Sequence, residues 1–266
     1  MKYDMFIADY DGTLGDFGGI NAETVKAIKE YERRGGIFAI CSGRMFKNVR
    51  DICNNYGIAS AVVSYQGARI NERESGKLLF GGEIEKGLAV EVLSSLKGLP
   101  VKPAVLSDEY IFYTQTSPYI EAYKIAKIVE LKQVNDLAKA AALGEFAVLK
   151  INVICGEENK ADFISENAEK YKGKLIVNSG GESLAEFINP NCSKGKSVEF
   201  LANHFGIPKS KVITVGDSTN DIELVRGEWH GVAVGDAKEE LKKYAKEVTV
   251  DYKNNPVKFL LEKYCL

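Results

Sequence analysis

The stretch MFIADYDGTL, residues 5–14, decides how this chain is expected to fold. Its first four residues are apolar and end at Asp9, and a short apolar run that stops at a turn is typical of a buried strand in a parallel sheet. A helical pattern follows over Ala22–Arg33, and further apolar runs follow over Ile37–Cys41 and Ala61–Val63. This alternation predicts an α/β fold with a Rossmann-like parallel sheet covered by helices on both faces.

The last quarter of the chain has the same alternation. Lys196–Phe205 has a helical pattern, and Val212–Val215 is an apolar run that ends at Gly216-Asp217. Another apolar run, Val232–Val234, ends at a glycine. We therefore expect this part of the chain to continue the sheet that begins at residue 5.

The middle of the chain has a different pattern, in which helix, strand and strand follow one another twice. Amphipathic helices are expected over Glu85–Leu96 and Tyr119–Leu131. This order predicts a smaller α+β domain with an antiparallel sheet and helices on one face. We expect residues 1–81 and 183–266 to form the core domain, and residues 82–182 to be inserted into it.

Length and composition exclude several classes of protein. The 266 residues are enough for one large or two modest domains, and 45% hydrophobic and 27% charged residues are ordinary globular values. A formal net charge of −2 gives no sign of a general nucleic-acid or anionic-membrane binder. No run of 18 apolar residues occurs, so we expect no membrane span.

The cysteines and histidines limit the chemistry further. Five cysteines without a CxxC pair indicate reduced thiols, and with no signal-peptide pattern at the start of the chain we expect a cytoplasmic protein. With only two histidines, the chain has no candidate His/Cys zinc site.

Polar residues follow four separate predicted strands or begin a predicted helix. In an open α/β sheet the ligand crevice lies outside the carboxyl ends of the strands, so we expect these residues to meet there. They are the pair Asp9 and Asp11, the pair Ser42 and Gly43, Lys194, and the pair Asp217 and Asp221.

If these residues meet, their charges call for a cation. Four carboxylates at close range disfavour joint ionisation. Hard oxygen ligands without imidazole or thiolate suit Mg²⁺, which also accepts water and substrate phosphate as ligands. A divalent cation, the ammonium of Lys194 and the hydroxyl of Ser42 would together match a phosphoryl dianion.

Each feature alone also has an ordinary structural explanation. Asp9 could be a turn residue, Lys194 a solvated lysine, and the run from Asp217 to Asp221 a helix-capping turn. Their joint occurrence, each after an apolar strand or at a helix start, favours a site. The sequence Gly195-Lys196-Ser197 is not the end of a P-loop, because position 190, where the first glycine would stand, is a proline.

The chain resembles the haloacid dehalogenase superfamily of phosphohydrolases in four motifs. They are DYDGTL at 9–14, ICSGR at 40–44, SKG at 193–195 and GDSTND at 216–221. The long insert and SYQGARI at 64–70 resemble the Cof-type subfamily, in which a mixed α/β cap is inserted in the core. The chain departs from that subfamily at Gln66-Gly67-Ala68, where Asn-Gly-Ala is usual, and at Asn255-Pro256-Val257, where Asp-Gly-Val is usual.

The resemblance implies a role for each motif residue. Asp9 would be the nucleophile that forms an aspartyl-phosphate, and Asp11 would be the general acid and then the base. Asp9, the backbone carbonyl of Asp11 and Asp217 would hold Mg²⁺, with Asp221 supporting its waters. The residues expected to bind the transferring phosphate are Ser42, Gly43, Lys194 and Asn220.

These roles imply a Mg²⁺-dependent phosphatase acting on small phosphate monoesters, such as sugar phosphates or phosphorylated cofactors. Two alternatives stay open: a phosphotransferase or mutase, and a non-catalytic protein that binds a phosphorylated ligand. The expected partner is a small-molecule phosphate ester, with no nucleic acid and no membrane. Monomer and homodimer both remain open.

Overall fold

The computed structural model describes residues 1–16, 18–108, 110–127, 129–180 and 183–266. The chain forms two compact units, which are described separately. The first unit contains Met1–Phe80 and Ser193–Leu266, and the second contains Gly81–Cys192. Within the described ranges, no helix has both the length and the apolar character needed to cross a membrane.

The first unit is built on an eight-stranded sheet with the order β14-β13-β12-β1-β2-β3-β4-β5. All pairs from β14 to β3 are parallel, and β4 runs antiparallel to β3. The strand bounds are β1 Met5–Ala8, β2 Ile37–Cys41, β3 Ala61–Ser64, β4 Arg69–Glu72, β5 Leu78–Gly81, β12 Val212–Gly216, β13 His230–Ala233 and β14 Glu247–Val248.

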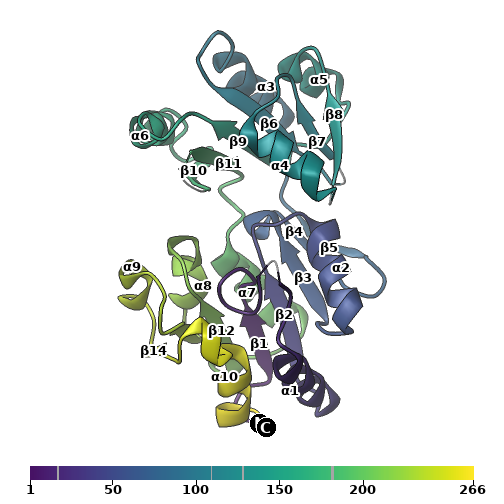
Figure 1. Cartoon of the computed structure of the whole chain (residues 1–266), viewed down its shortest axis with the longest axis vertical. Helices are drawn as coiled ribbons and strands as arrows, with labels where there is room; N and C mark the ends of the chain where they lie inside the picture. Colours follow the sequence, from purple (N-terminus) through teal and green to yellow (C-terminus); the bar gives the residue numbers. More distant parts are fainter. Residues whose placement is uncertain (17, 109, 128, 181–182) are drawn as a thin grey trace. The chain divides into compact units, whose positions relative to one another are not determined.

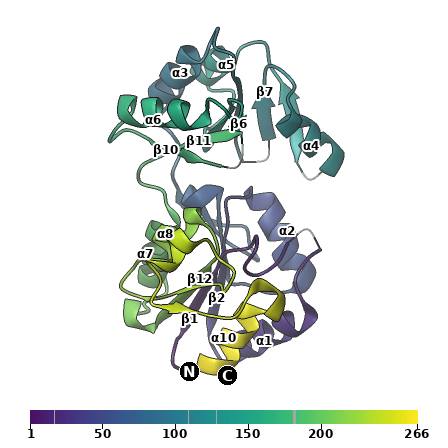
Figure 2. The ribbon, with the colours of Figure 1, turned by 60° about the vertical axis from the view of Figure 1, so that its left-hand side comes forward.

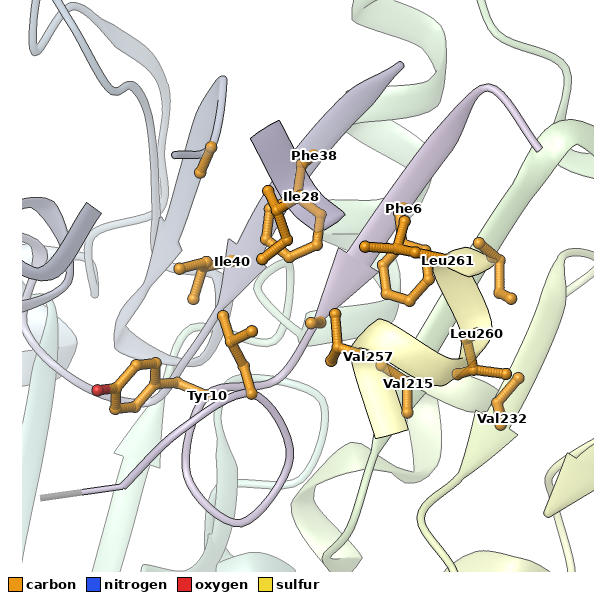
Figure 3. Close-up of a cluster of buried hydrophobic side chains, with 14 of the residues drawn as sticks. Phe6, Tyr10, Ile28, Phe38, Ile40, Val215, Val232, Val257, Leu260 and Leu261 are labelled. Atoms are coloured by element: carbon orange, nitrogen blue, oxygen red, sulfur yellow. The ribbon is translucent and has the colours of Figure 1, made fainter. Parts of the chain in front are cut away.

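Helices cover both faces of this sheet, as predicted from the continuous apolar strands. On one face, Phe6, Phe38 and Ile40 pack against residues of α1, α2 and α10, and Figure 3 shows Ile28 and Leu261 among them. On the other face, Met5 and the other alternate residues pack against α7 and α8. The helix bounds are α1 Ala22–Arg33, α2 Phe46–Tyr56, α7 Lys194–His204, α8 Ile222–Val225, α9 Glu239–Lys242 and α10 Pro256–Tyr264.

The two ends of the sequence meet within the first unit. Helix α10 packs beside α1, and Figures 1 and 2 show the last helix next to the first. Strand β1 lies between β12 and β2, so the first strand of the chain is central in the sheet. The prediction that the last quarter of the chain continues the first sheet is therefore confirmed.

The second unit contains a six-stranded sheet with the order β10-β11-β9-β6-β7-β8. The pairs are antiparallel except β7 with β8, which is parallel. The bounds are β6 Lys102–Leu106, β7 Tyr110–Tyr113, β8 Glu130–Gln133, β9 Lys150–Ile154, β10 Ile176–Ser179, β11 Leu184–Ile188, α3 Lys86–Ser95, α4 Pro118–Ala126, α5 Leu137–Leu143 and α6 Lys160–Lys170.

One face of this second sheet forms the apolar core of the unit. Val105, Phe112 and Ile151 belong to this core, where they pack with residues of α3 and α5. Helices α3 and α5 lie side by side (Figure 2). Each fully buried side chain of this size contributes about 1.5–3 kcal/mol. The prediction of an α/β fold with an inserted, smaller α+β domain is confirmed.

Two expectations about the second unit differ from the structure. The expected helix over Tyr119–Leu131 is wrong at its end, because α4 stops at Ala126, where Lys127 takes a left-handed conformation with φ of 52°. Leu131 lies instead in β8, which pairs with β7. The expected domain boundary, residue 182, lies outside the described residues, but β11 after it pairs with β9 and β10 and so belongs to the second sheet.

Candidate active site

The candidate active site lies where the first unit's central strands end. Asp9 follows β1, and its backbone N–H donates to the carbonyl of Val215 in β12 over 2.9 Å. Asp217 follows Gly216, the last residue of β12. Because β1 and β12 are neighbouring parallel strands, their carboxyl ends bring the two acids together, although 208 positions separate them in sequence.

Three carboxylates gather at this edge of the sheet. Asp9, Asp217 and Asp221 each offer an oxygen that lies within 4.8 Å of the others. Asp9 and Asp221 are buried, and Asp217 is half-buried. The structure therefore brings together three of the four acids that the sequence analysis singled out.

Lys194 neutralises part of this charge. Its Nζ donates to Oδ1 of Asp9 over 2.6 Å and to Oδ1 of Asp221 over 2.5 Å, and the residue is only 2% exposed. The SKG motif explains its position. Ser193 caps α7 by accepting a hydrogen bond from the N–H of Lys196, so Lys194 becomes the first residue of the helix.

Gly195, the third residue of the same motif, allows α7 to approach α8. A Cβ at this position would lie 2.6 Å from the carbonyl oxygen of Glu223. A larger residue would push α7 away and move Lys194 with it. The SKG motif thus supplies a cap, a cation and a close packing contact in three consecutive residues.

The Asp221 carboxylate organises the loop that carries Asp217. Its Oδ2 accepts the backbone N–H groups of Asp217 and Ser218 over 3.1 and 3.2 Å, while its Oδ1 is held by Lys194. Both oxygens of Asp221 are therefore engaged by the protein. Asp217 accepts a hydrogen bond from the Thr13 hydroxyl over 3.2 Å, which ties the first motif to the fourth.

Gly12 permits this tie. Its φ is +77°, a conformation that L side chains rarely adopt, and a Cβ would lie 2.8 Å from Oδ2 of Asp217. The turn is closed by the backbone N–H groups of Leu14 and Gly15, which donate to the carbonyl of Tyr10. Gly12 and Thr13 are not among the predicted site residues, although both lie inside the DYDGTL motif.

The electrostatics of the cluster call for a further cation. Burial raises the pKa of Asp9 well above its usual value, and the Asp221 charge adds to this rise. Burial likewise raises the pKa of Asp217 to about 6, with Asp221 again adding. Burial alone would lower the pKa of Lys194, but the Asp221 and Asp9 carboxylates outweigh burial and raise it. Three carboxylates thus share one ammonium.

A divalent cation such as Mg²⁺ fits this donor set. The cluster offers carboxylate oxygens, the hard ligands that Mg²⁺ prefers, and within the described residues no histidine or cysteine belongs to it. The two protein charges left uncompensated by Lys194 match the charge of such an ion. Asp9 and Asp217 are the candidate side-chain ligands, since Asp221 already uses both oxygens within the protein.

The side chain of Asp11 lies apart from the carboxylate cluster. It is 51% exposed and forms a two-pronged ion pair with Arg44, with Nε to Oδ2 at 2.9 Å and Nη2 to Oδ1 at 2.6 Å. The Arg44 guanidinium also lies 4.6 Å from the centre of the Tyr10 ring. Arg44 belongs to the ICSGR motif, but the sequence does not predict its pairing with Asp11.

The remaining predicted residues differ in their surroundings. Ser42 is buried at the end of β2, and its Oγ accepts the backbone N–H of Arg44 over 3.1 Å. Gly43 lies next to it, against the side chain of Gln66. Asn220 is exposed on the short helical turn Thr219–Asp221.

Comparisons with known proteins agree with this fold. The family model described as haloacid dehalogenase-like hydrolase matches residues 6–261. Phosphatase YwpJ of Bacillus subtilis is 26% identical and covers 91% of this chain and 93% of its own length. The crystal structure of TM0651 from Thermotoga maritima superposes with a TM-score of 0.85 at 22% identity, covering 98% of this chain and 97% of that one.

A second relative has a more specific name. The 5-amino-6-(5-phospho-D-ribitylamino)uracil phosphatase YwtE of Bacillus subtilis is 25% identical over 96% of this chain and 95% of its own length. Together with the family match, these similarities confirm the predicted resemblance and the prediction that the protein is a hydrolase. The chain belongs to the haloacid dehalogenase-like hydrolase family.

Proposed function

We propose that this protein is a phosphatase that hydrolyses small phosphate monoesters, with Asp9 as the nucleophile and Mg²⁺ as the cofactor. The observation that carries the proposal is the buried arrangement in which Lys194 joins Asp9 to Asp221 beside Asp217. The names of the relatives support it, since YwpJ is a phosphatase and the relative from Serratia proteamaculans, 21% identical, is an HMP-PP phosphatase.

In the first step, Asp9 attacks the phosphorus atom. Lys194 holds Oδ1 of Asp9, so we assign the attack to Oδ2, and the second lone pair of Oδ1 stays available to the metal. A bond forms from Oδ2 to phosphorus as the bond from phosphorus to the ester oxygen breaks. Asp11, which takes up a proton from solvent after it leaves Arg44, gives that proton to the leaving oxygen. Covalent catalysis of this kind divides one difficult displacement into two easier steps.

In the second step, water releases the phosphate. The water oxygen attacks phosphorus, the bond from phosphorus to Oδ2 of Asp9 breaks, and Asp11 takes a proton from the water. Asp11 is bound to Arg44 in this structure, so it must exchange Arg44 for the substrate or the water before it can transfer a proton. Its exposed side chain leaves it free to make that exchange.

The other predicted residues would bind the phosphate and the metal. We assign the phosphate oxygens to Ser42, Gly43, Lys194 and Asn220. Asp9, Asp217 and the backbone carbonyl of Asp11 would hold Mg²⁺, and Asp221 would steady the loop that presents Asp217. When bound, Mg²⁺ supplies positive charge that relieves the repulsion between Asp9 and an anionic substrate.

Sugar phosphates and phosphorylated cofactors are the substrate classes that we propose. YwtE and the HMP-PP phosphatase, by their names, act on phosphorylated compounds of small size. The five cysteines are all buried free thiols, which supports a reducing compartment such as the cytoplasm.

Phosphate release from a panel of monoesters tests the proposal. Wild-type protein is expected to release phosphate with Mg²⁺, to lose this activity with EDTA, and to regain it when Mg²⁺ is restored in excess. Asp9→Asn should abolish release while the fold is kept, whereas Asp162→Asn, at an exposed position of α6, should leave it unchanged. Substantial activity in Asp9→Asn would refute the assignment of the nucleophile. Phosphate found on an added alcohol would assign a phosphotransferase instead.

A further inference from the structure

The turn that follows β3 in the first unit has a strained backbone. Tyr65 has a φ of 52°, Gln66 a φ of 59° and Gly67 a φ of 100°, so three consecutive residues take positive values. Glycine adopts such values freely, but tyrosine and glutamine do so only at a cost in strain. All three residues are buried. Strain of this kind persists only where the surrounding structure imposes it, and it is concentrated at functional sites.

Two motifs of the candidate site hold this turn in place. The backbone N–H of Gln66 donates to the carbonyl of Ser42 over 3.2 Å, which ties the turn to the loop after β2. Gly67 packs against the SKG motif, since a Cβ at this position would lie 2.5 Å from the carbonyl oxygen of Ser193. The turn therefore contacts both the loop that carries Ser42 and the start of α7, where Lys194 lies.

The side chain of Gln66 lies against Gly43. A Cβ at Gly43 would lie 2.6 Å from Nε2 of Gln66 and 3.6 Å from its Oε1, so the nitrogen is the closer end of the amide. The absence of a side chain at position 43 thus makes room for this amide. Because Ser42 and Gly43 are among the residues to which we assign the phosphate oxygens, the amide nitrogen lies beside the proposed phosphate site.

The amide of Gln66 has no hydrogen-bond partner among the described residues, although Gln66 is only 9% exposed. A largely buried amide that has lost its water without gaining a partner destabilises the fold. Its polar atoms are not among those that the fold seals from solvent without a partner, so a ligand can reach them.

Glutamine is a costly choice for this position. Asparagine, which is usual here in the Cof-type subfamily, adopts a left-handed conformation more readily than glutamine does. The longer side chain brings more backbone strain and makes no internal hydrogen bond in return. The strained turn and the unpaired amide therefore point to a ligand that accepts a hydrogen bond from Gln66.

We propose that Gln66 is a further substrate-binding residue, whose amide N–H donates to a phosphoryl oxygen beside Gly43. The inference rests on the proposed function, which assigns the phosphate to Ser42 and Gly43. The amide nitrogen offers two donors, and the oxygens of a phosphoryl dianion are acceptors. A hydrogen bond to a charged oxygen is stronger than one between neutral groups, and the rigid turn holds the donor in place before the substrate binds.

Gln66→Glu tests this donor in the full-length protein, because glutamate keeps the shape of glutamine and replaces the amide nitrogen by an anionic oxygen. Two values should fall at least about tenfold, since a hydrogen bond to a charged group is lost. They are kcat/KM for the best monoester of the panel, and the affinity for inorganic phosphate with Mg²⁺ present, measured by isothermal titration calorimetry. Gln133→Glu makes the same change at an exposed position of β8 and should leave both values within about twofold of wild type.

Gln66→Asn separates binding from folding. Asparagine relieves backbone strain, which compensates for the loss of one methylene group, so the midpoint of urea unfolding should stay near that of wild type. The shorter amide no longer reaches the phosphate, so both kcat/KM and phosphate affinity should still fall about tenfold. If Gln66→Glu does not fold, Gln66→Asn decides alone. Unchanged phosphate affinity in either variant that folds would overturn the inference, whatever happens to kcat/KM.

Phosphate binding also distinguishes this inference from the proposed function. If the wild type hydrolyses no monoester, the proposed function fails. The inference about Gln66 then stands if the wild type binds phosphate and the Gln66 variants bind it about tenfold more weakly. If the wild type hydrolyses monoesters and the variants match its phosphate affinity, the inference fails and the proposed function is unaffected. A wild type that does not bind inorganic phosphate would also overturn the inference.

Discussion

Replacement of Lys194 by methionine removes the single ammonium that two buried carboxylates share. The Nζ of Lys194 lies 2.6 Å from Asp9 and 2.5 Å from Asp221, and the Lys194 side chain is 1% exposed. Methionine fills a similar volume, so the main effect is electrostatic. Removing one partner of a buried ion pair costs about 3–5 kcal/mol because the other charge is left uncompensated. We expect a loss of that size in the free energy of unfolding when no metal is present.

Urea unfolding followed by tryptophan fluorescence measures this loss in the first unit alone. The chain has a single tryptophan, Trp229, which is 3% exposed in the core on the α7 side of the first sheet. Lys209→Met is the matched control, since Lys209 pairs with Glu199 and Glu228 on the surface of the same unit. An exposed pair contributes about 0–1 kcal/mol, so the control should unfold near the wild-type midpoint.

A double variant distinguishes charge from packing. The double variant, Lys194→Met with Asp221→Asn, lacks both the ammonium and one of the carboxylates that it neutralised. Its loss in the free energy of unfolding should therefore be about 1–3 kcal/mol smaller than the sum of the losses in the two single variants. Equal midpoints for Lys194→Met and Lys209→Met would refute the account of a charge-compensated cluster. Strict additivity in the double variant would show that Lys194 acts by packing alone.

Three further predictions concern the loop, the metal and the edge of the first sheet. Gly12→Ala places a Cβ 2.8 Å from Asp217 at a φ of +77° and should lower Mg²⁺-dependent turnover at least about tenfold. The control is Gly35→Ala, where φ is +88° and a Cβ would meet nothing within 4 Å, so it should cost only about 1–2 kcal/mol of stability and leave turnover unchanged. Similar turnover in the two variants would contradict this prediction. Mg²⁺ at about 100 times its dissociation constant should raise the unfolding free energy of the wild type by about 2.7 kcal/mol. Asp217→Asn should abolish that rise, and a rise retained in this variant would place the ion elsewhere. Glu247 is partly buried, which alone would raise its pKa, but hydrogen bonds from the side chains of Tyr264, Lys263 and His230 lower it to about 2. The ionised Glu247 should therefore contribute about 2 kcal/mol to the free energy of unfolding above its unfolded pKa of about 4.5, and this contribution should be lost as the pH falls toward 2. Glu247→Gln should make the free energy of unfolding less dependent on pH over this acid range. An unchanged pH dependence in Glu247→Gln would contradict the prediction.

The sequence predicts the positions of those site residues that strand order and helix capping determine. The apolar runs that end at Asp9 and Asp217 become neighbouring parallel strands, and their carboxyl ends bring the two acids together. Ser193 is not among the predicted site residues, but it lies in the SKG motif, and its capping hydrogen bond places Lys194 at the first position of α7. These positions follow from strand order and helix capping, which are encoded locally.

The sequence does not predict the positions that depend on side-chain conformation or on pairing between distant strands. Asp11 has the same spacing to β1 whether its side chain joins the other carboxylates or pairs with Arg44, and the structure shows the pair with Arg44. The apolar residues over Tyr119–Leu131 fit a helical period, but Leu131 pairs with β7 as part of a strand. Asn152 and Glu186 lie 34 positions apart, and only the pairing of β9 with β11 brings them together.

Acid quenching during turnover tests the central claim most directly. Wild-type protein mixed with a substrate ester and Mg²⁺, stopped in acid and digested, should carry one phosphoryl group on the peptide that contains Asp9. Treatment with hydroxylamine should remove that group, as expected of an acyl phosphate. Active enzyme that carries no phosphoryl group under these conditions, or that carries it on Ser42, would contradict the account.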